Sequence, residues 1–113
     1  MKINNKLIDY PDISVEFPKY NSTYISTIGY ANVVRFGKLV IVNMNGQTSQ
    51  NVPGATALFT DLPQVKYSSR ALGSITFANN SSARVVAVGT EIRTCGAINF
   101  TGWFQGQIIY TTD

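Results

Sequence analysis

The stretch that decides the fold is residues 32–44, Asn-Val-Val-Arg-Phe-Gly-Lys-Leu-Val-Ile-Val-Asn-Met. Two runs rich in β-branched residues flank a short connection, in which Gly37 stands where a backbone of positive φ costs least. The second run, residues 39–42, is apolar at every position. A strand with one face in water would alternate apolar and polar residues. The run therefore predicts a strand covered on both faces, by a second sheet on one side and by a neighbouring subunit on the other.

The rest of the chain continues this pattern. Short β-rich runs recur about ten residues apart with turn-forming residues between them, and residues 85–88 are again apolar on both faces. No helix-length window shows a 3.6-residue period. We therefore predict an all-β fold, an antiparallel β-sandwich or jelly-roll-like head of about eight strands. Residues 1–23 are predicted to form an N-terminal arm, linker or edge strand, and residues 24–113 the β-sandwich head.

Composition limits the partners. Only 13% of the 113 residues are charged, and the nine lysine and arginine residues lie singly rather than in a basic run. A surface that tracks phosphates needs such a run, so we expect no nucleic-acid binding. The first residues lack the apolar core of a signal peptide, and no segment approaches the roughly 20 apolar residues of a membrane span. We expect neither a signal peptide nor membrane insertion.

The inventory of reactive groups is small. The chain has no histidine, one cysteine and six acidic residues. We therefore expect no metal, no cofactor and no enzymatic activity. Asp61 and Glu91 are interpreted as turn or surface residues, and Cys95 as a buried, inert thiol inside a strand.

Three segments, in order, resemble the C-terminal head domain of phage receptor-binding and tail-fibre proteins. Residues 33–44 are similar to the hairpin that opens that domain. Residues 52–63, Val-Pro-Gly-Ala-Thr-Ala-Leu-Phe-Thr-Asp-Leu-Pro, resemble its Pro-Gly-Thr segment, and residues 102–110, Gly-Trp-Phe-Gln-Gly-Gln-Ile-Ile-Tyr, resemble its closing strand. The chain departs from the pattern at residues 89–91, Gly-Thr-Glu, where the family usually has an Asn-Gly or Asp-Gly turn.

This resemblance implies a homotrimer at a tail tip or baseplate of a virion, attached to the rest of the phage tail. Such heads recognise saccharides on the bacterial surface or cell wall without turning them over. Two alternatives stay open: a structural trimerisation cap or spacer of a tail fibre or depolymerase with no ligand of its own, and a carbohydrate-active enzyme domain.

Candidate ligand-binding residues are aromatic platforms and hydrogen-bonding groups. Tyr67 and Arg70 could hold an anionic group such as glycerol phosphate, or the Tyr67 ring could pack over the end of the sandwich. Trp103 could stack on a sugar face or pack in the core or a subunit interface. Two polar turns are predicted, at residues 45–51 and 79–82. Residues 79–82 and, in the first turn, Gln47, Thr48, Gln50 and Asn51 could bind sugar hydroxyls or simply face water. Gln105 and Gln107 share one face of the last strand and line either a trimer axis or solvent. The full candidate set is Trp103, Tyr67, Arg70, Asn79, Asn80, Ser81, Gln47 and Gln50.

Overall fold

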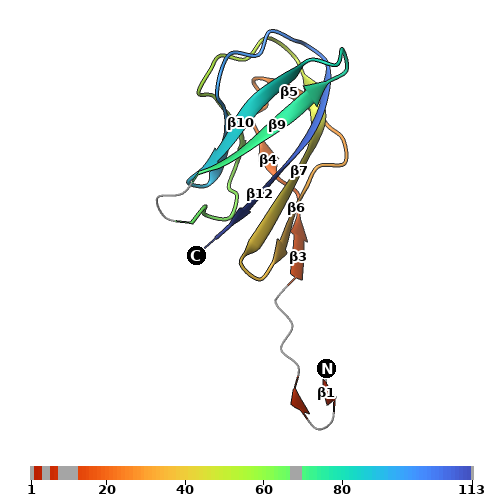
Figure 1. The fold of residues 1–113 in the computed structure, drawn as a ribbon. Coiled ribbons are helices and arrows are strands. Elements are labelled where there is room, and N and C mark those ends of the chain that lie inside the picture. The colour runs from red at the N-terminus through yellow and green to blue at the C-terminus, as the bar shows by residue number, and fades with distance from the viewer. Residues whose placement is uncertain (1, 4–5, 8–12, 67–69, 113) are drawn as a thin grey trace.

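The computed structural model describes residues 2–3, 6–7, 13–66 and 70–112, and these residues form an all-β fold (Figure 1). Every strand pairing is antiparallel, which confirms the predicted fold class. No helix among these residues is long and apolar enough to cross a membrane. The strands are β1 (Lys2–Ile3), β2 (Lys6–Leu7), β3 (Ile13–Glu16), β4 (Lys19–Tyr20), β5 (Ile25–Ile28), β6 (Asn32–Phe36), β7 (Leu39–Thr48), β8 (Ala57–Thr60), β9 (Ala71–Phe77), β10 (Ser82–Val88), β11 (Glu91–Thr94) and β12 (Trp103–Thr111).

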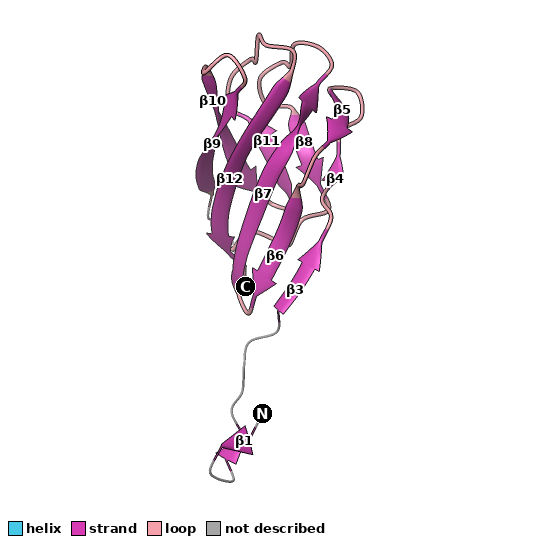
Figure 2. Ribbon diagram, turned by 90° about the vertical axis from the view of Figure 1, so that its right-hand side faces the viewer, coloured by secondary structure: helices cyan, strands magenta, loops and turns pink. Residues whose placement is uncertain are grey.

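Ten of these strands form one curled sheet. Its order is β3-β6-β7-β12-β9-β10-β11-β8-β4, and β5 pairs with β7 beside this path. The curl brings β11, β8 and β4 behind the long strands β7 and β12, so the sheet forms two layers (Figure 2). The predicted number of about eight strands is slightly low because β4 and β5 are short additions to the sheet.

The opening hairpin forms as predicted. Phe36 of β6 lies opposite Leu39 of β7, so the connection contains only two residues. Gly37, the first of them, has φ of 61°. A positive φ at the first residue of a two-residue loop is typical of a type II′ turn, whose twist matches that of the strands. Glycine at this position therefore fixes the register of the long strand β7.

The hydrophobic core lies between the two layers. Val40 and Val42 are 0% exposed, whereas Ile41 is half-buried and Leu39 is 37% exposed. A second layer therefore packs on the inner face of β7, as predicted, and it is formed by the curled continuation of the same sheet. On its outer face, β7 lies in line with β6 and β12 and has no second layer from the described residues.

The predicted polar turn at residues 45–51 was wrong over its first part. Strand β7 continues to Thr48, and only Ser49–Asn51 leave the sheet. Gly46 pairs with both Phe104 of β12 and Ile28 of β5, so a strand lies on each side of it. These two ladders override the turn preference of the Asn45–Gly46 pair.

The N-terminal segment contributes the two edges of the sheet. Strand β3 pairs with β6 at one end of the path, and β4 pairs with β8 at the other. Strands β1 and β2 pair with each other. Residues 13–20 thus extend the sheet that is formed by the strands from β5 to β12.

The prediction of a buried Cys95 was wrong, because the thiol is exposed. Strand β11 ends at Thr94, whose side chain points into the core and is only 2% exposed. Its hydroxyl donates to the Pro53 carbonyl oxygen at 2.8 Å. Cys95 follows directly after β11, and its side chain lies on the opposite side from that of Thr94, since successive residues of a strand face opposite ways.

Candidate functional site

The strands β3, β6, β7, β12 and β9 lie side by side and form the outer face (Figure 2). None of the described outward positions of this face holds a charged residue. Solvent-facing sheet surfaces normally include charged residues. Here the face is apolar towards the β6–β7 turn and rich in amides and hydroxyls beyond it. The outward positions are Ile13, Val15, Asn32, Val34, Phe36, Leu39, Ile41, Asn43, Asn45, Gln47, Leu72, Ser74, Thr76, Trp103, Gln105, Gln107, Ile109 and Thr111.

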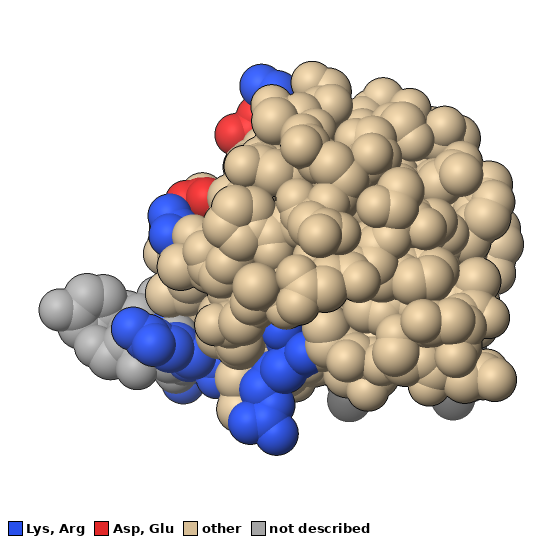
Figure 3. Space-filling view, turned by 90° about the horizontal axis from the view of Figure 1, so that it is seen from above, with Lys and Arg blue, Asp and Glu red and all other residues tan. Residues whose placement is uncertain are grey.

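Charged groups gather elsewhere on the molecule. In the view from above, blue and red atoms lie along the left half, and the right half, which faces the reader in Figure 2, is uncharged among the atoms described (Figure 3). Two ion pairs belong to the charged regions: Lys19 with Asp61 at 3.6 Å and Arg93 with Glu91 at 3.3 Å. The uncharged face is therefore a property of one side rather than of the whole surface.

A row of three amides crosses the middle of this face. Asn32, Asn43 and Gln107 lie opposite one another on β6, β7 and β12. The Gln107 Nε2 group donates to Asn43 Oδ1 at 2.8 Å, and Asn43 Nδ2 donates to Asn32 Oδ1 at 2.8 Å. Each amide offers two N–H donors and two acceptor lone pairs, so these two bonds leave most of the row's capacity for a ligand.

The amide row lines a shallow groove of about 540 Å³, which also includes Tyr30, Ser74 and Gln105. A second hollow of about 310 Å³ adjoins it and includes Asn45, Asn80 and Trp103. Both share Thr76 and Gln105, so together they make one trough, which we call the amide groove. Tyr30, 73% exposed, and Trp103, 45% exposed, belong to its two parts. The groove thus combines aromatic surfaces with neutral hydrogen-bonding groups.

Thr48 holds the segment that precedes Trp103. Its hydroxyl is buried and donates to the Phe100 carbonyl oxygen at 3.0 Å, and it accepts a hydrogen bond from the Gly102 N–H at 3.0 Å. The Thr48 N–H also donates to the Gly102 carbonyl oxygen at 2.9 Å. Gly102 has φ of 145°, a conformation that favours glycine. These bonds fix the entry into β12 and thereby the place of the indole.

Gly29 leaves room for the other side of the groove. Its N–H donates to the Asn45 carbonyl oxygen at 3.0 Å. A methyl group at Gly29 would overlap the Asn45 side-chain oxygen and would lie 3.6 Å from the Trp103 ring. The absence of a side chain at this position therefore allows Asn45 to lie close to the indole.

The chemistry of the amide groove suits an uncharged, hydroxyl-rich ligand. Amide and hydroxyl groups pair with hydroxyls as donors and as acceptors. Indole and phenol rings offer broad apolar faces with a polar edge. Among the residues that the structure describes, no charged side chain lines the groove, so these residues offer none of the forked cationic donors that select phosphates and carboxylates.

Some predicted site residues lie at this groove. Trp103 and Asn80 line it, and Gln47 lies opposite Trp103 on β7. Trp103 is therefore not a core residue. Asn79 and Ser81 flank Asn80 in the β9–β10 turn, where the Asn79 side-chain oxygen accepts a hydrogen bond from the Ser81 N–H.

Other predicted residues lie apart from it. Gln50 donates from Nε2 to the Thr23 carbonyl oxygen at 2.8 Å and does not line either hollow. Arg70 lines a different hollow of about 620 Å³ with Arg93 and Cys95. Tyr67 lies outside the described residues.

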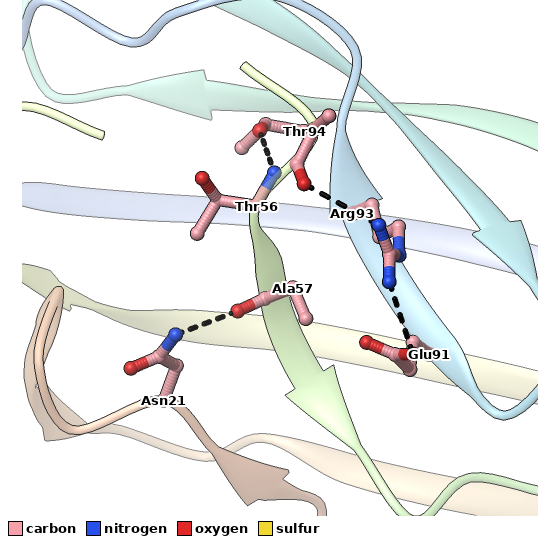
Figure 4. A network of polar contacts seen from close by, with 7 residues as sticks. Asn21, Thr56, Ala57, Glu91, Arg93 and Thr94 are labelled. Atoms are coloured by element: carbon pink, nitrogen blue, oxygen red, sulfur yellow. Dashed lines mark hydrogen bonds and ion pairs between the residues drawn. The ribbon is translucent and has the colours of Figure 1, made fainter. Parts of the chain in front are cut away.

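Around Arg93 the polar contacts serve the fold (Figure 4). Arg93 pairs with Glu91, and the Thr56 N–H donates to Thr94 Oγ1 at 2.9 Å. Asn21 Nδ2 donates to the Ala57 carbonyl oxygen at 2.9 Å. Because these groups satisfy one another and tie β8 to its neighbours, we do not assign a ligand to this side.

Sequence reasoning missed Tyr30, Asn32, Asn43 and Asn45 as groove residues. One signal was present: amides alternate along β7 at positions 43, 45 and 47 and along β12 at positions 105 and 107. Alternation places them on one face of each strand. Their alignment across the strands depends on register, which the sequence does not show.

Titratable chemistry is sparse in the part of the chain that the structure describes. There, no three His, Cys, Asp or Glu residues cluster as metal ligands. Burial raises the pKa of Tyr110 to about 12, partly offset by the charge of Arg35. The Tyr110 hydroxyl donates to the Pro63 carbonyl oxygen at 2.7 Å, a contact that closes the core.

The chain matches no protein-family model, and neither curated proteins nor solved structures give a match.

Proposed function

We propose that this domain is a non-catalytic, saccharide-binding head, and that its amide groove binds the ligand. The observation that carries the proposal is the combination of two exposed aromatic rings with a row of neutral amides on a sheet face that has no charge. Neutral sugars present hydroxyls around an apolar ring face, and both features have partners in the groove.

The biological setting is proposed from the resemblance of residues 33–44, 52–63 and 102–110 to phage receptor-binding heads. We propose that the head belongs to a phage tail fibre or baseplate and recognises a cell-wall or surface saccharide of a bacterium. In this proposal three copies assemble into a homotrimer. Weak individual sites gain avidity when several engage one surface, so a shallow groove suffices for attachment. Nucleic acid and membrane insertion play no part.

Binding to a panel of purified bacterial cell-wall polysaccharides tests the proposal. Trp103→Ala removes a stacking surface of the kind that dominates binding energies, so we expect at least a tenfold loss of affinity. Gln105→Ala removes one hydrogen-bonding side chain, and we expect a two- to tenfold loss, equivalent to about 0.5–1.5 kcal/mol. Gln64→Ala is the matched control, because Gln64 is also exposed but lies on the segment after β8.

Three results would overturn the proposal. One is a folded wild-type protein that binds no polysaccharide of the panel, as expected of a structural cap. Another is an affinity that stays the same in Trp103→Ala and Gln105→Ala as in the control variant Gln64→Ala. The third is release of new reducing ends from a bound polysaccharide, which would indicate the carbohydrate-active enzyme.

A further inference from the structure

We infer that the apolar half of the outer face is the surface through which copies of this chain associate. This half, which we call the apolar end, consists of six exposed residues and of the half-buried Val34 and Ile41 between them. The exposed residues are Ile13, Val15, Phe36, Leu39, Leu72 and Ile109. It lies towards the β6–β7 turn, on β3 and on the four strands that also carry the amide groove, β6, β7, β12 and β9 (Figure 2). The inference rests on the assembly part of the proposed function and gives that assembly an interface.

The apolar end is continuous across the sheet. Val15, Val34, Ile41 and Ile109 lie opposite one another in register on β3, β6, β7 and β12. Cross-strand neighbours on one face lie about 5 Å apart, so these side chains form an unbroken row. A parallel row, from Ile13 through Phe36 and Leu39, follows one step nearer the turn.

The exposed area is large for a single copy. Val15 is 65% exposed, Ile13 63%, Leu72 62% and Ile109 51%, with smaller fractions for Phe36 and Leu39. Summed over the six residues, this leaves roughly 600 Å² of residue surface in water, at the upper end for such a patch on a monomer. A stable interface buries about 800 Å² on each partner, so the apolar end with its rim has the size that one needs.

Charge favours a second copy of the same chain as the occupant. A face used for self-association meets itself, so like charges on it would repel, and the apolar end has none. At its two edges the charges are opposite: exposed Glu16 lies on β3, and exposed Arg70 directly precedes β9. Neither residue belongs to the apolar end, and Glu16 shares its strand face with the buried Val33.

Further apolar surface lies at both edges of the apolar end. A hollow of about 300 Å³, lined by Leu39, Ile109 and Arg70 among others, indents the face at the β9 edge. Phe17, just beyond β3, is 87% exposed at the opposite edge. Both enlarge the surface that a second copy would cover.

Sedimentation equilibrium of the full chain at about 50 µM, near the micromolar affinities of many specific complexes, tests this inference. We expect the wild type at a multiple of 12.4 kDa, about 37 kDa for three copies. Ile109→Asp and Val15→Asp each place a charge on the apolar end, and both variants should sediment at 12.4 kDa with an unchanged far-ultraviolet spectrum. Gln64→Asp, an exposed position outside it, should remain assembled.

A wild type that sediments as a single copy would overturn the inference, as would two aspartate variants that stay assembled. A single-copy wild type that binds anionic phosphatidylserine vesicles would instead identify the apolar end as a membrane surface. Saccharide binding is scored separately. Monomeric Ile109→Asp should keep the affinity of one groove and lose avidity. If Ile109→Asp separates the copies but Trp103→Ala does not change saccharide binding, the proposed ligand site is rejected and the proposed interface is retained.

Discussion

Replacing Thr48 by valine should destabilise the fold and displace Trp103. Valine has nearly the same shape, so the change removes only the hydroxyl. That hydroxyl is buried and serves the Phe100 carbonyl oxygen and the Gly102 N–H, both at 3.0 Å. Each backbone group left unpaired and buried costs about 1–3 kcal/mol. The Gly102 carbonyl oxygen keeps its bond from the Thr48 N–H, so we expect a total loss of about 3 kcal/mol.

Urea unfolding at a fixed protein concentration measures this loss. With a slope of about 2 kcal/mol per molar urea, the midpoint should fall by about 1.5 M while the slope stays unchanged. Trp103 is the only tryptophan, so its fluorescence reports directly on the segment that Thr48 holds. We expect the native emission of Thr48→Val to shift to longer wavelength, because the indole becomes more exposed to water.

Thr90→Val provides the control, because Thr90 is an exposed threonine in the β10–β11 turn. Its midpoint should lie within about 0.3 M of the wild type, as expected for an exposed position. An equal midpoint for Thr48→Val and Thr90→Val would show that the buried hydroxyl contributes nothing to the closing strand. The reasoning about Trp103 would then be refuted.

Three further predictions concern other sites. The pKa of Tyr110 is raised to about 12, so the stability contributed by its neutral phenol is complete below its ordinary pKa of 10 and is lost as the pH rises towards 12. Tyr110→Phe should therefore reduce the fall in melting temperature between pH 10 and 12. A fall as steep as that of the wild type would contradict this prediction. Gly106→Ala should lower the free energy of unfolding by about 3 kcal/mol, because the new methyl group would overlap the Ser74 carbonyl oxygen. A urea midpoint equal to that of the wild type would contradict the close approach of β9 to β12 at this position. Cys95 is exposed, so one thiol per chain should react with Ellman's reagent in the native state, and a reaction that requires denaturant would show burial instead.

The fold was readable from the sequence where local signals agree with tertiary packing. Gly37 marked the turn, and the apolar positions of residues 39–42 predicted a central strand. The signal failed at Asn45–Gly46, because pairing with β5 and β12 outweighs a local turn preference. It failed at Cys95 because β11 ends at Thr94, so the strand that was expected to include the cysteine does not reach it.

The amide groove was less readable, for a physical reason. Asn43 and Gln107 form a hydrogen bond across 64 positions of sequence, and this contact exists only in one register of β7 against β12. Trp103 and Asn80 were predicted as candidates from residue type alone, and the fold brings them to the same trough. Tyr30 carries no pattern of its own, since it becomes a groove residue only when the segment after β5 folds beside β7.

Side-chain amide chemical shifts give the most direct test of the central claim, that the uncharged amide groove binds saccharide. The protein, labelled with nitrogen-15, would be titrated with the cell-wall polysaccharide that binds best in the panel. We expect the largest shifts at the side-chain amides of Asn43, Gln105 and Gln107 and at the Trp103 indole N–H, with little change at Gln64. Shifts that instead concentrate around Arg70 and Arg93, or that never rise above those of Gln64, would contradict the account.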